Sequence, residues 1–340
     1  MINTRECILK YIGKAAVENI ALRVGKADRI LYEEYWSKGA SINQNTLFDM
    51  ASVTKVMVTA TLALIALERE LISLEDSVNK YIAGPADKAE MTIKHLLTHT
   101  TGIGYRLLTE KGVNYDNVAS YILGMQGDIP IGQDVRYSCP GFILLGKILE
   151  QVFEKRLDIV FAEEVSKPLG LTSTTFRPDR NRDCVNSNIE EAEKGLVNDY
   201  NCRHLGCVSG NAGVFSNMSD MTVFAKCLLR YGSPLISKQW FEEAIKNHTA
   251  GMSESRGLGY LYVDEKYKQT GNLFTKGSIG HCGHTGQSVF VDINTGLYVI
   301  ILSDATIATV KKYGEERYEE VIQLRQDIHN AIYKDLQRDI

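Results

Sequence analysis

Phe48-Asp-Met-Ala-Ser-Val-Thr-Lys55 is the stretch of this sequence that decides the fold and the chemistry. Ser52 and Lys55 are three residues apart, which places both side chains on one face of a helix at its first turn. The residues from Val53 to Glu70 are mostly apolar and contain neither Gly nor Pro, so they predict a buried helix. A serine hydroxyl becomes a nucleophile when a base lies within hydrogen-bond reach, and a lysine serves as that base when burial or neighbouring cations lower its pKa. We therefore predict Ser52 as nucleophile and Lys55 as base.

The same spacing occurs at Ser77-Val-Asn-Lys80, where we interpret it as an ordinary helix cap. Spacing alone is therefore a weak signal. The position of Ser52 at the mouth of a buried helix distinguishes it from Ser77.

Composition narrows the function classes around this motif. The 340 residues carry 38 Lys+Arg and 42 Asp+Glu, a net charge of −4, and 44% of them are apolar. Cations are not clustered, which excludes a nucleic-acid surface. The longest apolar run, residues 56–67, is too short to cross a bilayer, and the first 18 residues lack the apolar core of a secretory signal. Seven cysteines, an odd number, indicate reduced thiols. We expect a cytoplasmic protein without a membrane partner.

Strand patterns lie at both ends of the chain and helical patterns lie between them. The expected strands are residues 20–24, 30–36, 258–263, 287–292 and 297–303, and the expected helices are residues 93–99, 142–153, 221–229, 238–247 and 315–336. This order predicts an α/β lobe from residues 1–75 plus 255–340 and an inserted, mostly helical lobe from residues 76–254. The cleft between the lobes is the expected site.

Four blocks together resemble the superfamily of serine β-lactamases and penicillin-binding proteins, in its branch of class C enzymes and family esterases. They are the Ser52 motif, His95-Leu-Leu-Thr-His-Thr-Thr-Gly-Ile103, Val135-Arg-Tyr-Ser-Cys-Pro-Gly141 and Gly206-Cys-Val-Ser-Gly-Asn-Ala-Gly-Val-Phe-Ser216. The resemblance implies a single domain over residues 1–340: an antiparallel sheet built from both termini and flanked by helices, with the inserted helical lobe.

The resemblance also implies a second proton-transfer group. In the class C-like branch a tyrosine faces the nucleophile and shares its proton with the lysine, and this role falls on Tyr137. Cys139 is a substrate-contacting position at which the family usually has Asn or Asp. A thiol hydrogen-bonds weakly, so this departure argues against ordinary β-lactam or peptide recognition.

The last block is Gly280-His-Cys-Gly-His-Thr-Gly-Gln-Ser288. The nine-residue frame of the relatives assigns His281-Cys282-Gly283 to the strand that lines the site, with His281 catalytic and Cys282, Gly283 and His284 against the substrate. The oxyanion hole is then formed by the backbone N–H groups of Ser52 and His284. We expect the ionisation of His281 near pH ~6.5 to appear in the activity profile. The alternative register begins at His284 and uses Gln287 as the second oxyanion donor.

The expected function is a serine hydrolase that forms an acyl-enzyme on a small ester, amide or β-lactam-like molecule, without metal or cofactor. Alternatives are a D-Ala-D-Ala carboxypeptidase-type enzyme, a binding or regulatory protein on the same fold, and a cysteine enzyme with Cys139 as nucleophile and His281 as base. His95 and His99 have the spacing of a zinc helix, but position 96 is Leu where that motif needs Glu. We interpret these histidines as structural.

Overall fold

The computed structural model describes residues 1–14, 16–39, 41–108, 110–179, 183–188 and 194–338. In chain order its elements are α1 (Ile2–Gly13), β1 (Asn19–Lys26), β2 (Arg29–Ser37), β3 (Phe48–Asp49), the π-helical η1 (Lys55–Ala60), α2 (Thr61–Glu68), η2 (Val78–Lys80), η3 (Ala86–Lys88), α3 (Ile93–Leu97), α4 (Val118–Leu123), α5 (Cys139–Phe153), α6 (Leu157–Phe161), η4 (Ala162–Ser166), α7 (Lys167–Leu169), α8 (Tyr200–His204), β4 (Phe215–Ser216), α9 (Met218–Leu229), α10 (Lys238–Ala244), β5 (Leu261–Tyr262), β6 (Ile279–Cys282), β7 (Ser288–Asp292), β8 (Leu297–Ser303), α11 (Ala305–Tyr313) and α12 (Tyr318–Arg338).

The main sheet joins the two ends of the chain. Its strand order is β2-β1-β8-β7-β6-β5, and every neighbouring pair is antiparallel. The pairing of β1 with β8 sets Leu22 against Ile301 and so connects the first forty residues with the last fifty. This is the antiparallel sheet built from both termini that the sequence predicts. The lobe boundaries at residues 75 and 255 stay a prediction.

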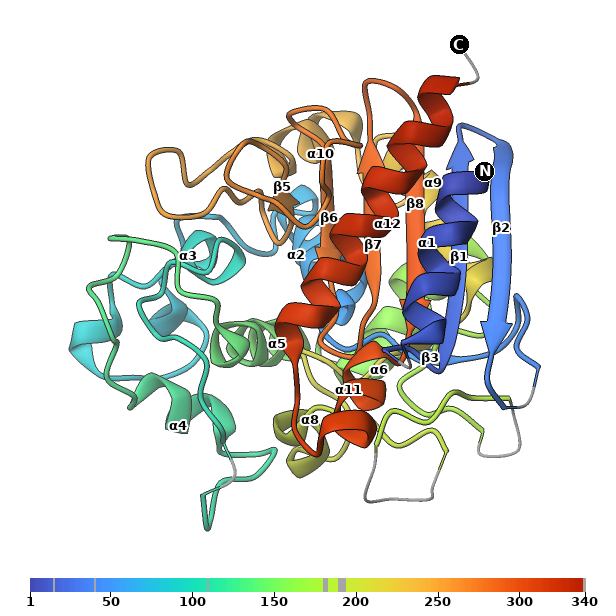
Figure 1. The fold of residues 1–340 in the computed structure, drawn as a ribbon. Helices are drawn as coiled ribbons and strands as arrows, with labels where there is room; N and C mark the ends of the chain where they lie inside the picture. Colours follow the sequence, from blue (N-terminus) through green and yellow to red (C-terminus); the bar gives the residue numbers. More distant parts are fainter. Residues whose placement is uncertain (15, 40, 109, 180–182, 189–193, 339–340) are drawn as a thin grey trace.

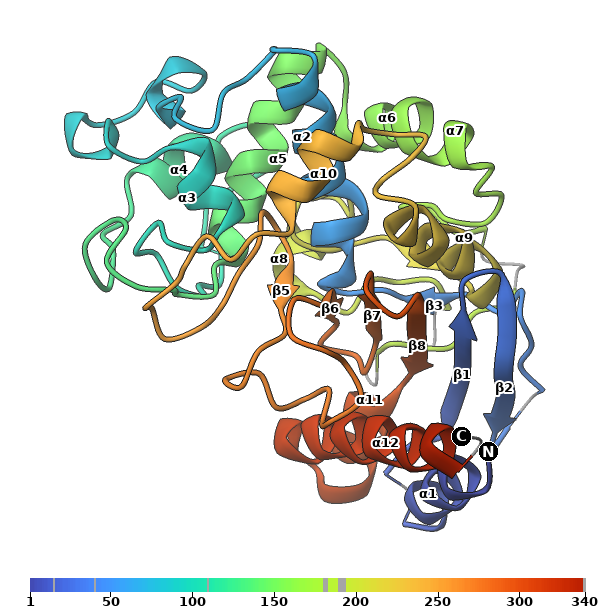
Figure 2. The ribbon, with the colours of Figure 1, turned by 90° about the horizontal axis from the view of Figure 1, so that it is seen from above.

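Helices cover both faces of this sheet (Figures 1 and 2). Helices α1 and α12 lie side by side across one face, and α9 and α2 lie on the other. Alternate residues of β1 supply both cores: Leu22 packs in the cluster under α1 and α12, and Ala21 packs in the larger cluster that contains α2, α5 and α9. The two-sided packing explains why every residue of β7 and β8 is buried and why their central residues are apolar.

The helix predicted from residues 53–70 is present with one difference. Residues 55–60 form a π-helical turn before α2 begins at Thr61. All of these residues are buried, Lys55 included. A π-helical turn adds a residue to the winding of the chain, and such turns are frequent at functional sites.

Candidate active site

A tight turn between β3 and η1 presents Ser52. Ala51 has a φ of 45°, in the left-handed region that residues other than glycine rarely occupy. The Asp49 carboxylate accepts a hydrogen bond from the Ala51 N–H at 2.8 Å and another from the Asn198 N–H at 2.6 Å. Burial raises the pKa of Asp49 to about 6, although these two hydrogen bonds favour its charged form. Asp49 therefore fastens the Ser52 turn to the Asn198 loop.

Ser52 Oγ accepts two hydrogen bonds from the residues predicted to move its proton. The Tyr137 hydroxyl donates at 2.7 Å and the Lys55 ammonium at 3.0 Å. Lys55 Nζ also donates to the Asn211 carbonyl at 2.9 Å. The structure thus brings together Ser52 and Lys55 from one segment and Tyr137 from another.

The protonation states of Tyr137 and Lys55 follow from their burial and from the attraction between their charged forms. Burial raises the pKa of Tyr137, although Lys55 favours its ionised form. Burial opposes the ammonium form of Lys55, but Cys139 and Tyr137 attract that ammonium when they are ionised, and the Lys55 pKa is raised above its ordinary value. Lys55 would need a lowered pKa to act alone as the base. Its pKa is raised instead. Loss of one proton from the Tyr137–Lys55 pair makes one of its members an acceptor for the Ser52 proton.

The two backbone donors predicted for the oxyanion hole lie on one cleft. Within the described residues, neither the Ser52 N–H nor the His284 N–H donates to a protein acceptor. The carbonyls on either side of the His284 N–H are held by side chains: Arg325 donates to the Gly283 carbonyl and Thr306 to the His284 carbonyl. A Cβ at Gly283 would lie 2.7 Å from the Met50 carbonyl oxygen, so only glycine allows β6 to approach the Ser52 turn this closely.

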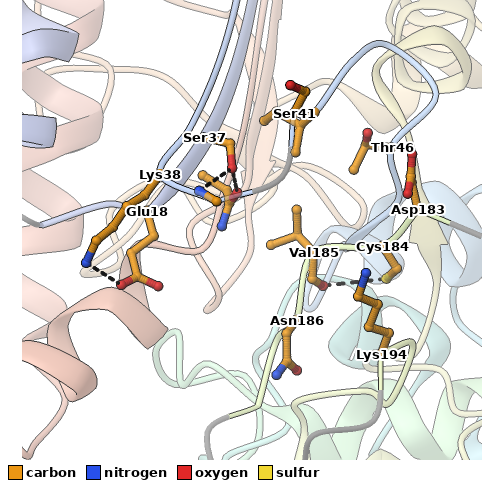
Figure 3. Close-up of a pocket in the computed structure, with 13 residues that line it drawn as sticks. Glu18, Ser37, Lys38, Ser41, Thr46, Asp183, Cys184, Val185, Asn186 and Lys194 are labelled. Atoms are coloured by element: carbon orange, nitrogen blue, oxygen red, sulfur yellow. Dashed lines mark hydrogen bonds and ion pairs between the residues drawn. The ribbon is translucent and has the colours of Figure 1, made fainter.

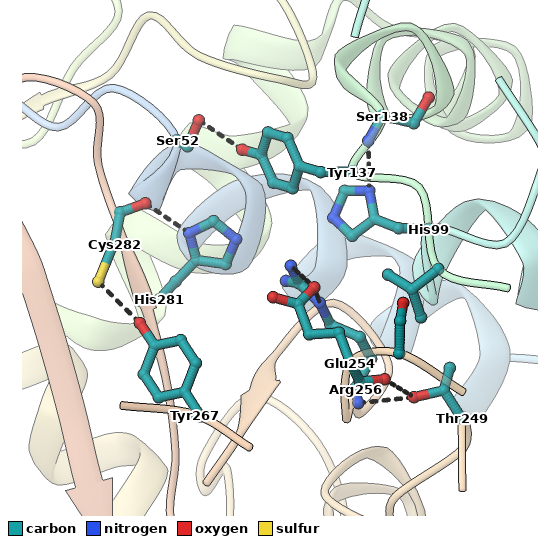
Figure 4. A network of polar contacts seen from close by, with 12 residues as sticks. Ser52, His99, Tyr137, Ser138, Thr249, Glu254, Arg256, Tyr267, His281 and Cys282 are labelled. Carbon is teal, nitrogen blue, oxygen red and sulfur yellow. Dashed lines mark hydrogen bonds and ion pairs between the residues drawn. The ribbon is translucent and has the colours of Figure 1, made fainter. Parts of the chain in front are cut away.

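The structure places His281 near Tyr137 and Gln287 in the core. The His281 ring lies on β6 with its centroid 6.3 Å from that of Tyr137, and Nδ1 hydrogen-bonds the Cys282 carbonyl at 2.7 Å (Figure 4). Gln287 is instead occupied in the core, where its amide donates to the Asp49 carbonyl at 2.7 Å. The His284 side chain is 41% exposed and contacts Glu316 at 3.1 Å.

The expected titration of His281 near neutral pH is wrong. Burial, and then the positive charges of Arg256 and Lys55, hold the pKa of His281 well below its ordinary value. The ring stays neutral, with its proton on Nδ1 because the partner of Nδ1 is a carbonyl oxygen.

The two cysteines of the predicted substrate surface differ in placement. Cys139 Sγ lies 3.6 Å from Lys55 Nζ, beside the nucleophile, and burial raises the pKa of this thiol. Cys282 lines the cleft, but its sulfur contacts the Tyr267 hydroxyl at 3.2 Å within the core under α12. A raised thiol pKa at Cys139 and a His281 nitrogen bonded to a carbonyl do not favour a cysteine–histidine nucleophile.

Two cavities of about 290 and 460 Å³ meet at Ser52, Tyr137 and His284. The smaller one is also lined by Glu254, Arg256, Leu261, Tyr267, Gln269, His281, Cys282 and Tyr318. The larger one is also lined by Ala51, Tyr105, Leu107, Cys139, Asn198, Asp199, Tyr200 and Glu316. Glu254, Arg256, Asp199 and Glu316 were missed by sequence reasoning. Their local patterns are those of solvated loops, and no spacing signal marks them.

Another cavity, of about 420 Å³, lies near the end of β2 and is lined by Glu18, Lys38, Cys184 and Val185 among others (Figure 3). Ser52 is not among its lining residues. This cavity is therefore separate from the cleft at Ser52.

The remaining motif histidines have structural partners. His95 caps α3 through Thr92, whose N–H donates to His95 Nδ1 at 3.1 Å. His99 lies beyond the end of α3, and its Nδ1 accepts from the Ser138 N–H at 3.0 Å. Ser77 caps η2 by accepting from the Asn79 N–H, as predicted. None of the helices formed by the described residues has both the length and the apolar character needed to cross a membrane.

Known proteins resemble this chain in sequence and in fold. The sequence profile described as "Beta-lactamase" matches residues 5–320. A protein of Escherichia coli O157:H7 named "Putative D-alanyl-D-alanine carboxypeptidase" is 27% identical over 343 residues, covering 85% of this chain and 79% of its own. Among solved structures, EstCE1, described as a hydrolase with promiscuous acyltransferase activity, has a TM-score of 0.77 at 19% identity and covers 97% of both chains. Simvastatin synthase from Aspergillus terreus has a TM-score of 0.76 at 18% identity, covering 99% of this chain and 98% of its own. These similarities confirm the predicted fold class, and the chain belongs to the beta-lactamase family of serine hydrolases.

Proposed function

We propose that Ser52 is the nucleophile of an acyl-transfer reaction on a small ester or amide, with Tyr137 and Lys55 as the groups that carry its proton. The observation that carries this proposal is the pair of hydrogen bonds to Ser52 Oγ, at 2.7 Å from Tyr137 and 3.0 Å from Lys55, at the meeting point of two cavities.

In the first step Ser52 Oγ forms a bond to the carbonyl carbon of the substrate, and its proton passes to the singly deprotonated Tyr137–Lys55 pair. The pair then gives this proton to the alcohol or amine part of the substrate. That part departs, and the acyl group stays on Ser52 as an ester. A water molecule attacks that ester, gives a proton to the pair, and releases the acid as Ser52 regains its hydrogen. The N–H groups of Ser52 and His284 receive the negative charge that develops on the carbonyl oxygen. His281 supports the Tyr137 ring.

The charges that line the cleft favour a neutral substrate over one that bears a carboxylate. Glu254, Asp199 and Glu316 line it, and two of the three nitrogens of the Arg256 cation are already paired with Glu254. His281 is neutral, and Cys139 supplies no amide to pair with a substrate amide. We therefore propose a preference for neutral esters over β-lactams and over D-Ala-D-Ala peptides, both of which carry a carboxylate.

A reducing compartment fits the same proposal. Six of the cysteines, Cys7, Cys139, Cys184, Cys202, Cys227 and Cys282, are free thiols, as expected of a cytoplasmic protein. We propose a cytoplasmic location on this ground.

The decisive experiment is labelling with a fluorophosphonate, followed by mass-spectrometric mapping and by turnover of p-nitrophenyl acetate. We expect the label on Ser52 and a loss of several orders of magnitude in kcat for Ser52→Ala with an unchanged fold. Ser77→Ala is the matched control, because Ser77 belongs to the same spacing but only caps η2. It should label and turn over like the wild type.

Three results would overturn the proposal. Label on Cys139 would indicate a cysteine enzyme. Full turnover by Ser52→Ala would remove the nucleophile assignment, and absence of both label and turnover in the folded wild-type protein would favour a binding or regulatory protein. For the substrate preference, a kcat/KM on nitrocefin well above that on a butyrate ester in the same buffer would contradict the argument from charge.

A further inference from the structure

Within the described residues, two cationic side chains and two histidine rings lie near the Tyr137 ring. Lys55 Nζ lies 4.9 Å and the Arg256 guanidinium carbon 5.7 Å from the ring centroid. The His99 and His281 rings lie 4.7 and 6.3 Å away, centroid to centroid. Burial and the Arg256 charge hold the pKa of both histidines well below the ordinary value, so both rings are neutral. Arg256 is therefore the second cation beside Tyr137.

The fold holds this cation in place at a cost. Arg256 is 3% exposed. Its main chain is fixed by the Thr249 hydroxyl, which accepts from its N–H at 2.9 Å, and by a bridge to Leu261. Nε and Nη2 both donate to one oxygen of Glu254, whereas Nη1 is buried without an acceptor among the described residues. Leaving a buried charged donor unpaired is unfavourable.

The position of Arg256 and Glu254 in the cleft suggests a function for this unfavourable burial. Glu254 binds one edge of the guanidinium and is 36% exposed, so it faces solvent. Figure 4 shows Arg256 and Glu254 near Tyr137, between His281 and His99. Cys139 lies 3.6 Å from Lys55 Nζ, and Asp199 attracts Lys55 at longer range. Other titratable groups face the same centre: Tyr267, His284, Tyr318 and Glu316 line the two cavities, and the Arg325 charge acts on His281.

We propose that Arg256 is a positioning residue that acts through Tyr137, because its charge favours the loss of one proton from the Tyr137–Lys55 pair. That loss takes the pair from a net charge of one to zero, and a neighbouring cation makes it easier. Glu254 partly cancels this effect, so the two residues act in opposite directions. The inference rests on the proposed function, in which this pair accepts the Ser52 proton.

The test is the pH dependence of kcat/KM on p-nitrophenyl acetate for Arg256→Gln, Arg256→Lys and Glu254→Gln. The acid limb reports deprotonation of the pair. We expect Arg256→Gln to shift this limb to higher pH by about one unit and Arg256→Lys to shift it in the same direction by less. Glu254→Gln should shift it to lower pH by about half a unit. A purely structural role of Arg256 predicts a lower plateau with the limb in place. Equal limbs in all three variants, or shifts of the same sign for Arg256→Gln and Glu254→Gln, would overturn the inference.

Two controls separate the role of Arg256 from misfolding and from failure of the proposed function. Circular dichroism and thermal unfolding establish that each variant is folded, and if Arg256→Gln is not, the half-exposed Glu254→Gln still tests the sign. Tyr137→Phe separates the two proposals. If it retains full activity, the proposed function fails; if it is inactive while Arg256→Gln keeps the wild-type limb, only the role of Arg256 fails.

Discussion

Asp49 is a buried carboxylate three residues before Ser52, and its charge opposes folding while its hydrogen bonds shape the nucleophile turn. Its pKa is raised from 3.8 to about 6, so the folded protein binds a proton that the unfolded chain releases. Protonation of Asp49 therefore stabilises the folded state relative to the unfolded chain. This stabilisation is fully present below pH ~4 and is lost as the pH rises through ~6. The pKa shift corresponds to about 3 kcal/mol of unfolding free energy.

We therefore expect the unfolding free energy of the wild type, minus that of Asp49→Asn, to fall between pH ~4 and ~6 and to be level above. Urea unfolding at a series of pH values measures this difference. A level difference across the window would show that Asp49 does not titrate with a raised pKa.

His281 and His284 carry different expectations because one acts through its ring and the other through its main chain. His281→Ala removes the buried ring beside Tyr137 and should lower kcat/KM by roughly tenfold or more. His284→Ala keeps the backbone N–H and should retain most activity. Steady-state kinetics on one ester compare the two variants. The reverse result would mean that the motif begins three residues later.

At the scale of elements, the approach of β6 to the Ser52 turn depends on the absence of a side chain at Gly283. Gly283→Ala puts a methyl group 2.7 Å from the Met50 carbonyl oxygen, so the strand or the turn must move. Misplacement of oxyanion donors by about 1 Å costs up to ~100-fold in rate. We expect a kcat/KM reduced by tenfold or more.

Gly13→Ala is the control for this substitution, since a Cβ there meets no atom within 4 Å. It should behave as the wild type in the same assay. Wild-type activity of Gly283→Ala would contradict the close approach.

The sequence predicts these elements unevenly, and the reasons are physical. Runs of β-branched and apolar residues mark β1 and β8, whose observed bounds contain or equal the predicted ones. Helix α11 was not expected, because Thr306, Ile307 and Thr309 are β-branched and read as strand. The π-helical turn at Lys55 depends on packing around a buried ammonium and leaves no periodic signal. Arg256 reads as a solvated loop cation because its burial depends on contacts with distant Tyr137.

At the scale of the whole molecule, the carboxylate of Asp335 contributes four hydrogen bonds between the two end helices. Asp335 on α12 accepts from the Asn3 N–H and side-chain amide at 3.1 and 2.7 Å, and from the Thr4 N–H and hydroxyl at 2.8 and 2.7 Å. Asp335→Ala leaves these donors without their partner. We expect the unfolding free energy to fall by about 1–3 kcal/mol with kcat/KM unchanged well below the melting temperature.

Urea denaturation and ester kinetics on the same preparation measure both quantities. A loss of kcat/KM in fully folded Asp335→Ala would show that the end helices also tune the cleft.

The strand order β2-β1-β8-β7-β6-β5 also has a consequence for chain connectivity. Asn3 and Asp335 are in contact, so a short linker can join the present ends. A circular permutant that begins at exposed Gly251 then runs through β5, β6, β7, β8, β1 and β2, and each strand pairs with the next one along the chain. The longest-range strand pairing, β1 with β8, becomes shorter in range, because only the helices α11, α12 and α1 and the linker then separate the two strands. Lower contact order speeds folding, so this permutant should refold faster than the natural chain order in stopped-flow experiments.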